Sequence, residues 1–282
     1  MSTYEPSASR IDSKEAGLEI GLYFFKFFIK SEYLHYGYFS DGLPTDIANL
    51  AKAQANYAEL LLSNIPSDVK SILDVGCGSG KFTQQLLDKG YDVDCVSPGT
   101  LLTNYVKKLI GDRGKLYNSK FEDFTPLKKY DLILFSESFQ YIPIDRSLGD
   151  SINHLRENGY IMVCDFFKND PQGKSQLGGG HEWKDWEAKL LKYPLKKLIE
   201  KDITAETAPT IDLVNTMTLD VIQPIWKTVF ALGENRFPLV MKFIRWKYKK
   251  KLEKMELKHF SGLRSGENFR NYKKYMFYLL QK

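Results

Sequence analysis

The sequence predicts an α/β fold with a mostly parallel sheet, and three observations support that prediction. Short apolar runs bounded by turns, such as DLILF and YIMVCDF, are typical of strands that are buried on both faces. Segments in which apolar residues have helical spacing separate most of these runs. A glycine-rich turn at 76–80 directly follows the first run. Strands that alternate with helices favour a parallel sheet with right-handed crossovers.

The alternation starts after residue 70 and sets the expected order of elements. We expect strands at 70–75, 91–96, 114–119, 130–135, 158–165, 196–203 and 273–281. We expect helices between them at 80–89, 98–110 and 145–156. Because ligands of open parallel sheets bind at the carboxyl ends of the strands, the functional site is expected beside 76–80.

Two helical segments lie outside this alternation. The first, residues 1–60, is an aromatic lead that contains GLYFFKFFIK and SEYLHYGYFSDG and ends in a helix near 45–64. The second, about 205–260, separates the last two expected strands. Since 282 residues are enough for a full core and the sequence has no internal repeat or low-complexity linker, we expect one domain with an integral cap.

Composition limits the class of protein. The hydrophobic fraction of 43% and the mean hydropathy of −0.35 are those of an ordinary soluble protein. Three scattered cysteines argue against a disulfide framework or a zinc site, and four dispersed histidines form no metal-ligand pattern. The N-terminal MSTYEPSASR lacks the apolar core of a signal peptide, and the apolar stretch at 17–29 is too short to span a bilayer. We therefore expect a cytoplasmic protein without a metal cofactor.

The turn at 76–80 has the composition of three classes of ligand-binding loop. A dinucleotide fingerprint needs a glycine where Lys81 stands. A P-loop needs Ser or Thr where Phe82 stands and glycine where Val75 stands. An acid followed by G-x-G-x-G, with Asp74 leading, resembles motif I of class I S-adenosylmethionine (SAM)-dependent methyltransferases. The remaining alternative is a glycine turn that only connects a strand to a helix.

The motif I resemblance implies a cofactor site. In that family the glycines pass under the amino-acid part of SAM and the acid helps to orient its ammonium group, which implies these roles for Gly76, Gly78, Gly80 and Asp74. Glycines let a backbone approach a ligand without interference from Cβ. We therefore expect SAM as the cofactor.

The residues after the second and third expected strands correspond to the family's ribose and adenine contacts, and the end of the second strand departs from the family pattern. Cys95 stands where an acid often binds the ribose hydroxyls, so we expect Ser97 to contact the cofactor through its backbone. Asp94 is an alternative ribose ligand, although a regular strand would point it to the other face. Phe121 and Glu122 lie where the family contacts adenine, and an acidic helix start is the alternative.

The fourth strand and its loop, YDLILFSESFQYIP at 130–143, resemble the family's F-D-x-[V/I] strand and L-x-H-[V/I] loop. The resemblance puts Ser136 over the methionine part of SAM, and Gln140 and Tyr141 at the pocket. Amino-methyltransferases of nucleic-acid bases commonly carry [DNS]-P-P-[YFW] here, and the pyrimidine carbon-5 enzymes carry a Pro-Cys nucleophile. SESFQ has neither pattern, so we expect a small-molecule acceptor and no nucleic acid.

The aromatic lead narrows the resemblance. Residues 34–39, LHYGYF, resemble the x-H-x-G-[Y/F] segment of tocopherol, sterol and cyclopropane-synthase-like small-molecule methyltransferases, where it closes over SAM and lines the acceptor pocket. This implies a cofactor contact for Tyr36 and a catalytic position for Tyr38; the alternative is that these rings pack the cap onto the core. Tyr141 and His181 are the other catalytic candidates, and a helix-start histidine without a catalytic role is the alternative for His181.

The resemblance covers roughly 65–168 and implies a Rossmann-like class I methyltransferase sheet, mostly parallel with an antiparallel last strand, beneath a helical cap. We expect a single domain, 1–282, divided into an N-terminal helical cap at 1–64, a SAM-binding core at 65–204, a helical lid insertion at 205–260 and a final strand region at 261–282. The expected function is SAM-dependent methyl transfer to a small, substantially apolar or lipid-like acceptor. The alternatives are a cyclopropanating or methyl-branching lipid enzyme and a SAM-binding regulatory protein without turnover.

Charge is distributed unevenly along the chain. The net charge is +5, and a dense basic run, KFIRWKYKKKLEKMELK, occupies 242–258. A solvated helix face explains such a run, and a peripheral membrane contact is the alternative.

Overall fold

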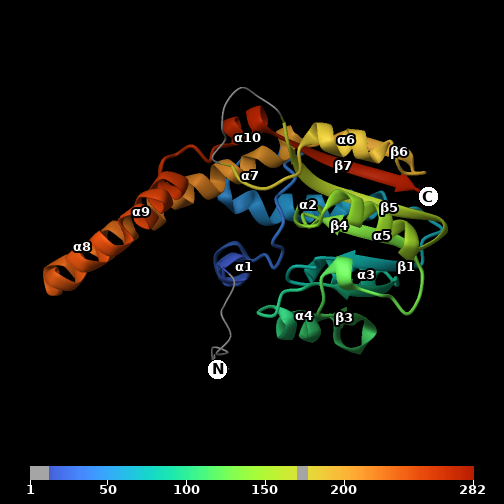
Figure 1. Ribbon diagram of the computed structural model, residues 1–282, viewed down its shortest axis with the longest axis horizontal. Helices are drawn as coiled ribbons and strands as arrows, with labels where there is room; N and C mark the ends of the chain where they lie inside the picture. Colours follow the sequence, from blue (N-terminus) through green and yellow to red (C-terminus); the bar gives the residue numbers. More distant parts are fainter. Residues whose placement is uncertain (1–12, 170–176) are drawn as a thin grey trace.

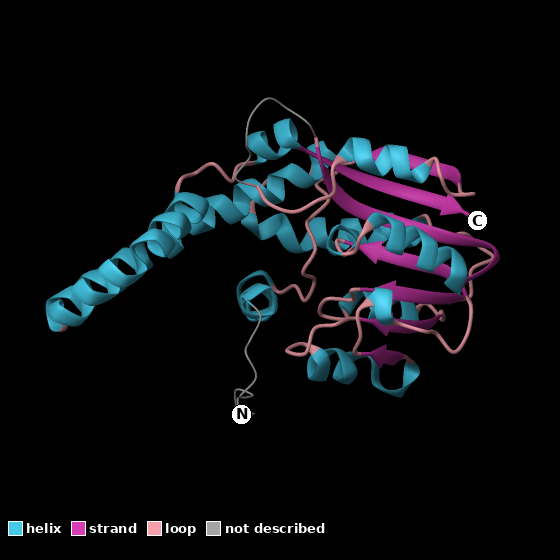
Figure 2. Ribbon diagram, in the orientation of Figure 1, coloured by secondary structure: helices cyan, strands magenta, loops and turns pink. Residues whose placement is uncertain are grey.

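The computed structural model describes residues 13–169 and 177–282, and its centre is a seven-stranded sheet (Figures 1 and 2). The strand order is β3-β2-β1-β4-β5-β7-β6, and β7 is antiparallel to both neighbours whereas the other pairs are parallel. The strands are β1 Ser71–Val75, β2 Asp92–Val96, β3 Lys115–Tyr117, β4 Tyr130–Ser136, β5 Leu155–Lys168, β6 Lys196–Asp202 and β7 Lys273–Gln281. The expected Rossmann-like α/β sheet with an antiparallel last strand is confirmed.

Two strands differ in length from the expectation. The third is shorter than 114–119 because β3 lies at the edge of the sheet and pairs with β2 over Lys115–Tyr117 alone. The fifth is longer than 158–165. Its partner β7 pairs with it as far as Lys168, opposite Lys273, and thereby extends it beyond the apolar run.

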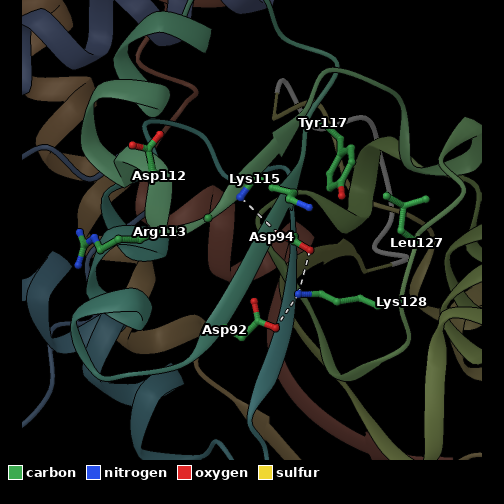
Figure 3. Close-up of a pocket in the computed structure, with 9 residues that line it drawn as sticks. Asp92, Asp94, Asp112, Arg113, Lys115, Tyr117, Leu127 and Lys128 are labelled. Atoms are coloured by element: carbon green, nitrogen blue, oxygen red, sulfur yellow. Dashed lines mark hydrogen bonds and ion pairs between the residues drawn. The ribbon is translucent and has the colours of Figure 1, made fainter.

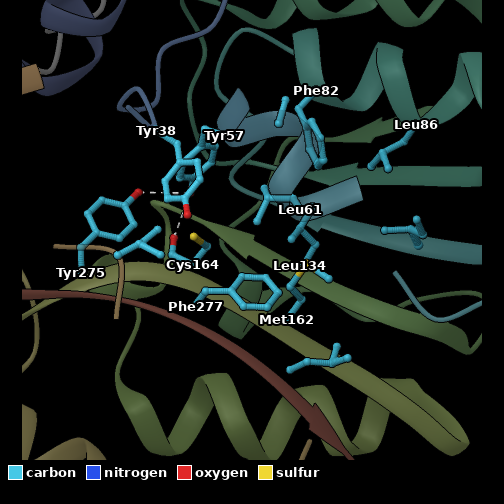
Figure 4. Packing of buried hydrophobic residues seen from close by; sticks show 14 of the residues in the cluster. Tyr38, Tyr57, Leu61, Phe82, Leu86, Leu134, Met162, Cys164, Tyr275 and Phe277 are labelled. Atoms are coloured by element: carbon cyan, nitrogen blue, oxygen red, sulfur yellow. Dashed lines mark hydrogen bonds between the residues drawn. The ribbon is translucent and has the colours of Figure 1, made fainter. Parts of the chain in front are cut away.

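Helices cover both faces of the sheet. Successive strand residues point to opposite faces, so Ile72 and Leu132 belong to one buried cluster whereas Leu73 and Ile133 belong to the other. The first face is covered by α2 Leu50–Ser63, α3 Lys81–Asp88, α4 Thr103–Ile110 and α7 Thr204–Met217. The second face is covered by α5 Ile144–His154 and α6 Trp183–Leu190. Figure 4 shows part of the first cluster.

The segment at 205–260 is not a single helix. From α7 the chain continues through η6 Thr218–Ile222 and α8 Gln223–Arg236, and it reverses at Phe237 into α9 Pro238–Phe260. Phe237 leaves helical geometry, and Pro238 begins the next helix because its fixed φ and missing N–H suit a first helical turn. Figure 1 shows that α8 and α9 project from the sheet as a helical hairpin.

The remaining elements are short or lie at the edges. They are α1 Ser13–Phe24, η1 Phe25–Ile29, η2 Ile47–Asn49, η3 Gly111–Arg113, η4 Phe121–Asp123, η5 Phe139–Tyr141 and α10 Gly266–Tyr272. The helix expected near 45–64 corresponds to η2 and α2 together. Over residues 13–169 and 177–282, no helix combines the length and apolarity that crossing a membrane requires.

Candidate cofactor and acceptor site

The glycine turn joins β1 to α3 at the carboxyl edge of the parallel strands. Gly76, Gly78 and Gly80 have positive φ angles of 77°, 56° and 78°, which other residues rarely adopt. A Cβ on Gly76 would lie 2.5 Å from Ser138 Cβ, and a Cβ on Gly80 would lie 3.0 Å from Val106 Cγ1. Packing of the turn therefore requires glycine at both of these positions.

Gly78 differs because a Cβ there would make only an ordinary van der Waals contact. The nearest atom would be Leu34 Cδ1, at 3.9 Å. Leu34 belongs to the aromatic lead, so the lead lies over the turn. The space beside Gly78 is a cradle in which a ligand can touch the backbone and which a larger side chain would fill.

Asp74 lies in β1 just before the turn, and its side chain is buried. Its Oδ2 accepts a hydrogen bond from Thr83 Oγ1 at 2.6 Å. Burial raises the pKa of Asp74 to about 6, and the hydrogen bond from Thr83 opposes that shift. A cationic group bound beside Asp74 would favour the ionised carboxylate, so this residue suits a ligand that carries an ammonium group.

The end of β2 presents Ser97 rather than Asp94 to the turn. The backbone N–H of Ser97 donates to the Tyr117 carbonyl at 3.0 Å, so a cofactor contact would use its hydroxyl or carbonyl. Asp94 accepts from the Tyr130 hydroxyl at 2.9 Å and lies 3.1 Å from Lys128 Nζ. Asp94 is therefore occupied elsewhere, as the alternation of the strand predicts.

The expected adenine contacts follow β3. The ring of Phe121 is buried against Phe135, with centroids 5.4 Å apart, which leaves its backbone for a ligand contact. Glu122 is partly buried, and its carbonyl accepts from the guanidinium of Arg146.

A pocket of about 210 Å³ lies between the starts of β2 and β3, away from the glycine turn (Figure 3). Its lining residues are Asp92, Asp94, Asp112, Arg113, Gly114, Lys115, Tyr117, Leu127 and Lys128. The Lys128 ammonium lies 2.6 Å from Asp92 and 3.1 Å from Asp94. The pocket adjoins the amino ends of the strands, whereas parallel sheets bind ligands at the carboxyl ends.

Hydrogen bonds hold the aromatic lead along the edge of the sheet where the parallel strands have their carboxyl ends. Ser79 Oγ donates to the Glu32 carbonyl at 2.6 Å, and the Tyr33 hydroxyl donates to Gln85 Oε1 on α3 at 2.7 Å. Farther along, the Gly37 N–H donates to Thr210 Oγ1 of α7 at 2.9 Å. The lead thus connects the glycine turn to the base of the helical segment that precedes the hairpin.

Glu137 occupies the centre of this edge. It has a φ of +55°, a conformation that costs free energy in a non-glycine residue and that clusters at functional sites. Its Oε1 accepts from the Tyr36 backbone N–H and from the Tyr275 hydroxyl, each at 2.7 Å. Burial raises the pKa of Glu137 to about 8, although both hydrogen bonds favour the carboxylate.

A chain of hydroxyls extends from Glu137 into the core. The Tyr275 hydroxyl lies 3.1 Å from that of Tyr57, which lies 3.1 Å from Ser136 Oγ (Figure 4 shows Tyr57 and Tyr275). Tyr57 also donates to the Cys164 carbonyl at 3.3 Å. Ser136 is thereby placed in the same network as Glu137, at the end of β4.

A second buried acid lies on β5. Asp165 accepts from the backbone N–H and the Nε2 of Gln140, each at 3.0 Å, and burial raises the pKa of Asp165 to about 7. Gln140 Oε1 accepts from the Gly180 N–H at 3.2 Å. The Gln140 amide thus links β5 to the glycine turn at 178–180, and this network already uses both ends of the amide.

The three expected catalytic residues have other contacts. His181 Nε2 lies 2.9 Å from the Ile142 carbonyl and 3.1 Å from the Phe139 carbonyl, so Nε2 carries a proton that it donates, and this nitrogen is not free to act as a base. The Tyr141 side chain is 63% exposed. The Tyr38 hydroxyl accepts from Lys201 Nζ at 2.9 Å.

Glu137, Tyr57 and Tyr275 are functional candidates that were not predicted from the sequence. The signal for Glu137 was present, because an acid directly follows the apolar strand at 130–136 and so must lie at the carboxyl edge. Tyr57 and Tyr275 carried no comparable signal. They come from a helix and a strand that are distant in sequence, and only the fold brings them together.

Comparison with known proteins identifies the family. A methyltransferase domain model matches residues 49–199. A malonyl-[acyl-carrier protein] O-methyltransferase of Ilyobacter polytropus is 30% identical over 137 residues, which cover 46% of this chain and 51% of that protein. A phthiotriol/phenolphthiotriol dimycocerosates methyltransferase of Mycobacterium ulcerans is 28% identical over 182 residues, or 61% and 59% of the two chains. The chain spans about half the length of the curated relatives that it matches.

Solved structures share the fold. A mycolic acid cyclopropane synthase complexed with SAH and CTAB superposes with a TM-score of 0.68 at 16% identity, covering 96% of this chain and 99% of that one. The chain belongs to the methyltransferase domain family. The family resemblance makes SAM the cofactor, and the cradle at Gly78 and the buried Asp74 fit its amino-acid part.

Proposed function

We propose that the protein transfers the SAM methyl group to a small, substantially apolar or lipid-like acceptor, with Glu137 as the proton acceptor. The observation that carries this proposal is the Glu137 carboxylate, held at the carboxyl edge by Tyr36 and Tyr275. The edge also holds the glycine turn, so cofactor and acceptor would meet beside a base. Methyl transfer depends mainly on positioning and exclusion of water, which a covering lead can supply.

The residues that would hold the cofactor lie along one edge of the sheet. They are Asp74, Gly76, Gly78, Gly80, Ser97, Phe121, Glu122, Ser136 and Tyr36. Gln140, also expected here, already uses its amide on Asp165 and Gly180, so we assign it to positioning Asp165. SAM when bound supplies a sulfonium methyl group. Its positive charge near Glu137 would lower the pKa of this carboxyl from about 8 and make the carboxylate available at neutral pH.

The protein's own task is then to remove one proton. An acceptor with a hydroxyl, amine or activated carbon loses a proton when it gains the methyl group. Because Glu137 Oε1 already accepts two hydrogen bonds, we assign the proton to Oε2. The Tyr36 N–H and the Tyr275 hydroxyl fix the carboxylate in place without being consumed.

Aromatic side chains beside Glu137 support an apolar acceptor. The Tyr36 ring centroid lies 6.0 Å from that of Phe166 and 5.9 Å from that of Phe269, and the last two are 5.9 Å apart. The names of two relatives and neighbours, a dimycocerosates methyltransferase and a mycolic acid cyclopropane synthase, point in the same direction. Segment 1–64 would form the cap of this site. Of the segment 205–260, expected to be a lid, α7 contacts the lead over the site, through Thr210, whereas residues 223–260 project away from the sheet. We expect the protein in the cytoplasm.

The test is incubation with methyl-labelled SAM and a small-molecule extract of the host, followed by mass spectrometry. We expect label in an apolar product with the wild type and with Glu157→Gln, an exposed control, and little label with Glu137→Gln. Methylation and cyclopropanation both raise the mass by one CH₂, so the carbon–carbon double bonds of the product are counted as well, and their retention indicates methylation. Loss of a double bond would indicate the cyclopropanating or methyl-branching alternative. SAM binding without any labelled product would support the regulatory alternative and contradict the proposal.

A further inference from the structure

The helical hairpin formed by α8 and α9, residues 223–260, extends away from the sheet (Figures 1 and 2). The two helices pack closely where Gly233 faces Met241, since a Cβ on Gly233 would lie 3.1 Å from Met241 Sδ. We call this element the hairpin arm. Its base joins α7, whose Thr210 contacts the lead over the candidate site.

The hairpin arm carries the positive charge of the protein. Residues 223–260 contain ten Lys and Arg and three Glu, a net charge of +7, whereas the whole chain has +5. The rest of the chain is therefore slightly acidic, at −2. Most of the cations lie on α9, and Lys247, Lys249, Lys250 and Lys251 are all exposed.

The outer end of the hairpin arm is apolar and exposed. Leu239 is 82% exposed and Trp246 is 76% exposed, and Phe237, Val240 and Phe243 are also exposed. Leu239, Phe243 and Trp246 are spaced by four and three residues, so they lie on one side of α9. Large exposed apolar groups in such a cluster mark an interaction surface.

We propose that the hairpin arm binds an anionic lipid bilayer, with the apolar end in the interface and the α9 cations against the headgroups. Charge complementarity selects this occupant. A second copy of an arm of net charge +7 would be repelled, whereas anionic headgroups attract it. Trp and Phe at the end of a basic helix suit the boundary between headgroups and acyl chains. The proposal does not depend on the proposed methyl transfer.

The experiment is sedimentation of the full chain with vesicles, without SAM. We expect binding to phosphatidylcholine vesicles with 30% phosphatidylserine at 50 mM salt, at least tenfold weaker binding at 500 mM salt, and no binding to pure phosphatidylcholine. Replacing Lys247, Lys249, Lys250 and Lys251 by Gln should weaken binding about 1000-fold, at roughly 1 kcal/mol per cation. A matched control, K52Q/K70Q/K107Q/K108Q, removes four exposed cations from other elements and should bind as the wild type.

A second variant tests the apolar end. The double change Leu239→Ser and Trp246→Ser keeps every charge and should weaken binding at least tenfold while circular dichroism stays unchanged. Equal loss in the two quadruple lysine variants would overturn the proposal, because it would reduce the effect to net charge. An absence of pelleted protein at low salt would also overturn it. The proposal would also be overturned if the wild type formed dimers that the double change dissociates, because the apolar end would then bind a second copy of the chain.

Discussion

Glu137 Oε1 lies 2.7 Å from the hydroxyl of Tyr275, although 138 positions separate the two residues in the sequence. Glu137 directly follows the central strand β4, and Tyr275 belongs to the antiparallel strand β7. The same oxygen accepts from the Tyr36 N–H of the lead, so three distant segments meet at one carboxylate. A partly buried acid that is held so firmly and has a raised pKa is suited to general-base catalysis.

The first prediction concerns removal of that base. Glu137→Gln keeps the size of the side chain but cannot accept the acceptor's proton, so kcat should fall about 10²- to 10⁴-fold. SAM affinity measured by calorimetry should stay within a few-fold of the wild type. Glu157→Gln is the control, since Glu157 is exposed and pairs only peripherally with Lys282. Full activity of Glu137→Gln would remove Glu137 from the mechanism.

The second prediction concerns the pH dependence. A base must be deprotonated to act, so kcat/KM should rise with pH through an apparent pKa near 8, the value to which burial raises Glu137. Tyr275→Phe removes a hydrogen bond that favours the carboxylate, and the apparent pKa should therefore move upward. A variant that lost activity equally at every pH would assign Tyr275 a purely structural role.

The third prediction concerns the cofactor cradle. Gly78→Val should abolish SAM binding in calorimetry, because the new side chain fills the space beside the backbone. The positive φ costs roughly 1–2 kcal/mol of stability, so the variant should still fold. Gly42→Val is a matched control with a φ of +73° and open space around its Cβ, but it lies outside the turn. Wild-type SAM affinity in Gly78→Val would refute the cradle.

The fourth prediction concerns stability. Burial raises the pKa values of Asp74, Asp165 and Glu137 to about 6, 7 and 8, above their ordinary values of 3.8, 3.8 and 4.5. At these three groups the folded protein therefore binds protons more tightly than the unfolded chain, so their contribution to stability is greatest below the ordinary values and is lost as pH rises through 6 to 8. Urea unfolding without ligand should give a smaller free energy at pH 8.5 than at pH 5. Asp165→Asn should reduce this difference, and a stability independent of pH would contradict the prediction.

The centre of the sheet was predictable from sequence because its strands, such as β4 and β5, contain short apolar runs with their own turn signals. The motif I glycines were predictable for the same local reason. Glu137, in contrast, was overlooked because its role depends on Tyr36 and Tyr275, which only the fold brings to it. The reversal at Phe237 was also overlooked, since the pattern of apolar residues continues through Pro238 and only the proline indicates the start of a second helix.

The fifth prediction separates His181 from the catalytic base. His181 Nε2 donates to carbonyls of the loop after β4, and its ring packs edge-on against Phe139 with centroids 5.6 Å apart. His181→Gln should therefore lower thermal stability, because it disturbs a partly buried loop contact that is worth about 1 kcal/mol. Its kcat should fall less than tenfold, and its pH profile should keep the same apparent pKa as the wild-type profile measured with SAM saturating.

The comparison with Glu137→Gln makes this test decisive. If His181 were the base, its loss would lower kcat at least 100-fold and remove the rise of activity with pH, while Glu137→Gln would leave that rise in place. If Glu137 is the base, Glu137→Gln lowers kcat at least 100-fold and removes the rise of activity with pH, whereas His181→Gln leaves that rise in place. We therefore measure the activity of both variants from pH 6 to pH 9.5 with SAM saturating, and the two profiles assign the proton to one residue or the other. We expect Glu137, because its carboxylate has hydrogen bonds from Tyr36 and Tyr275 that hold it toward the site.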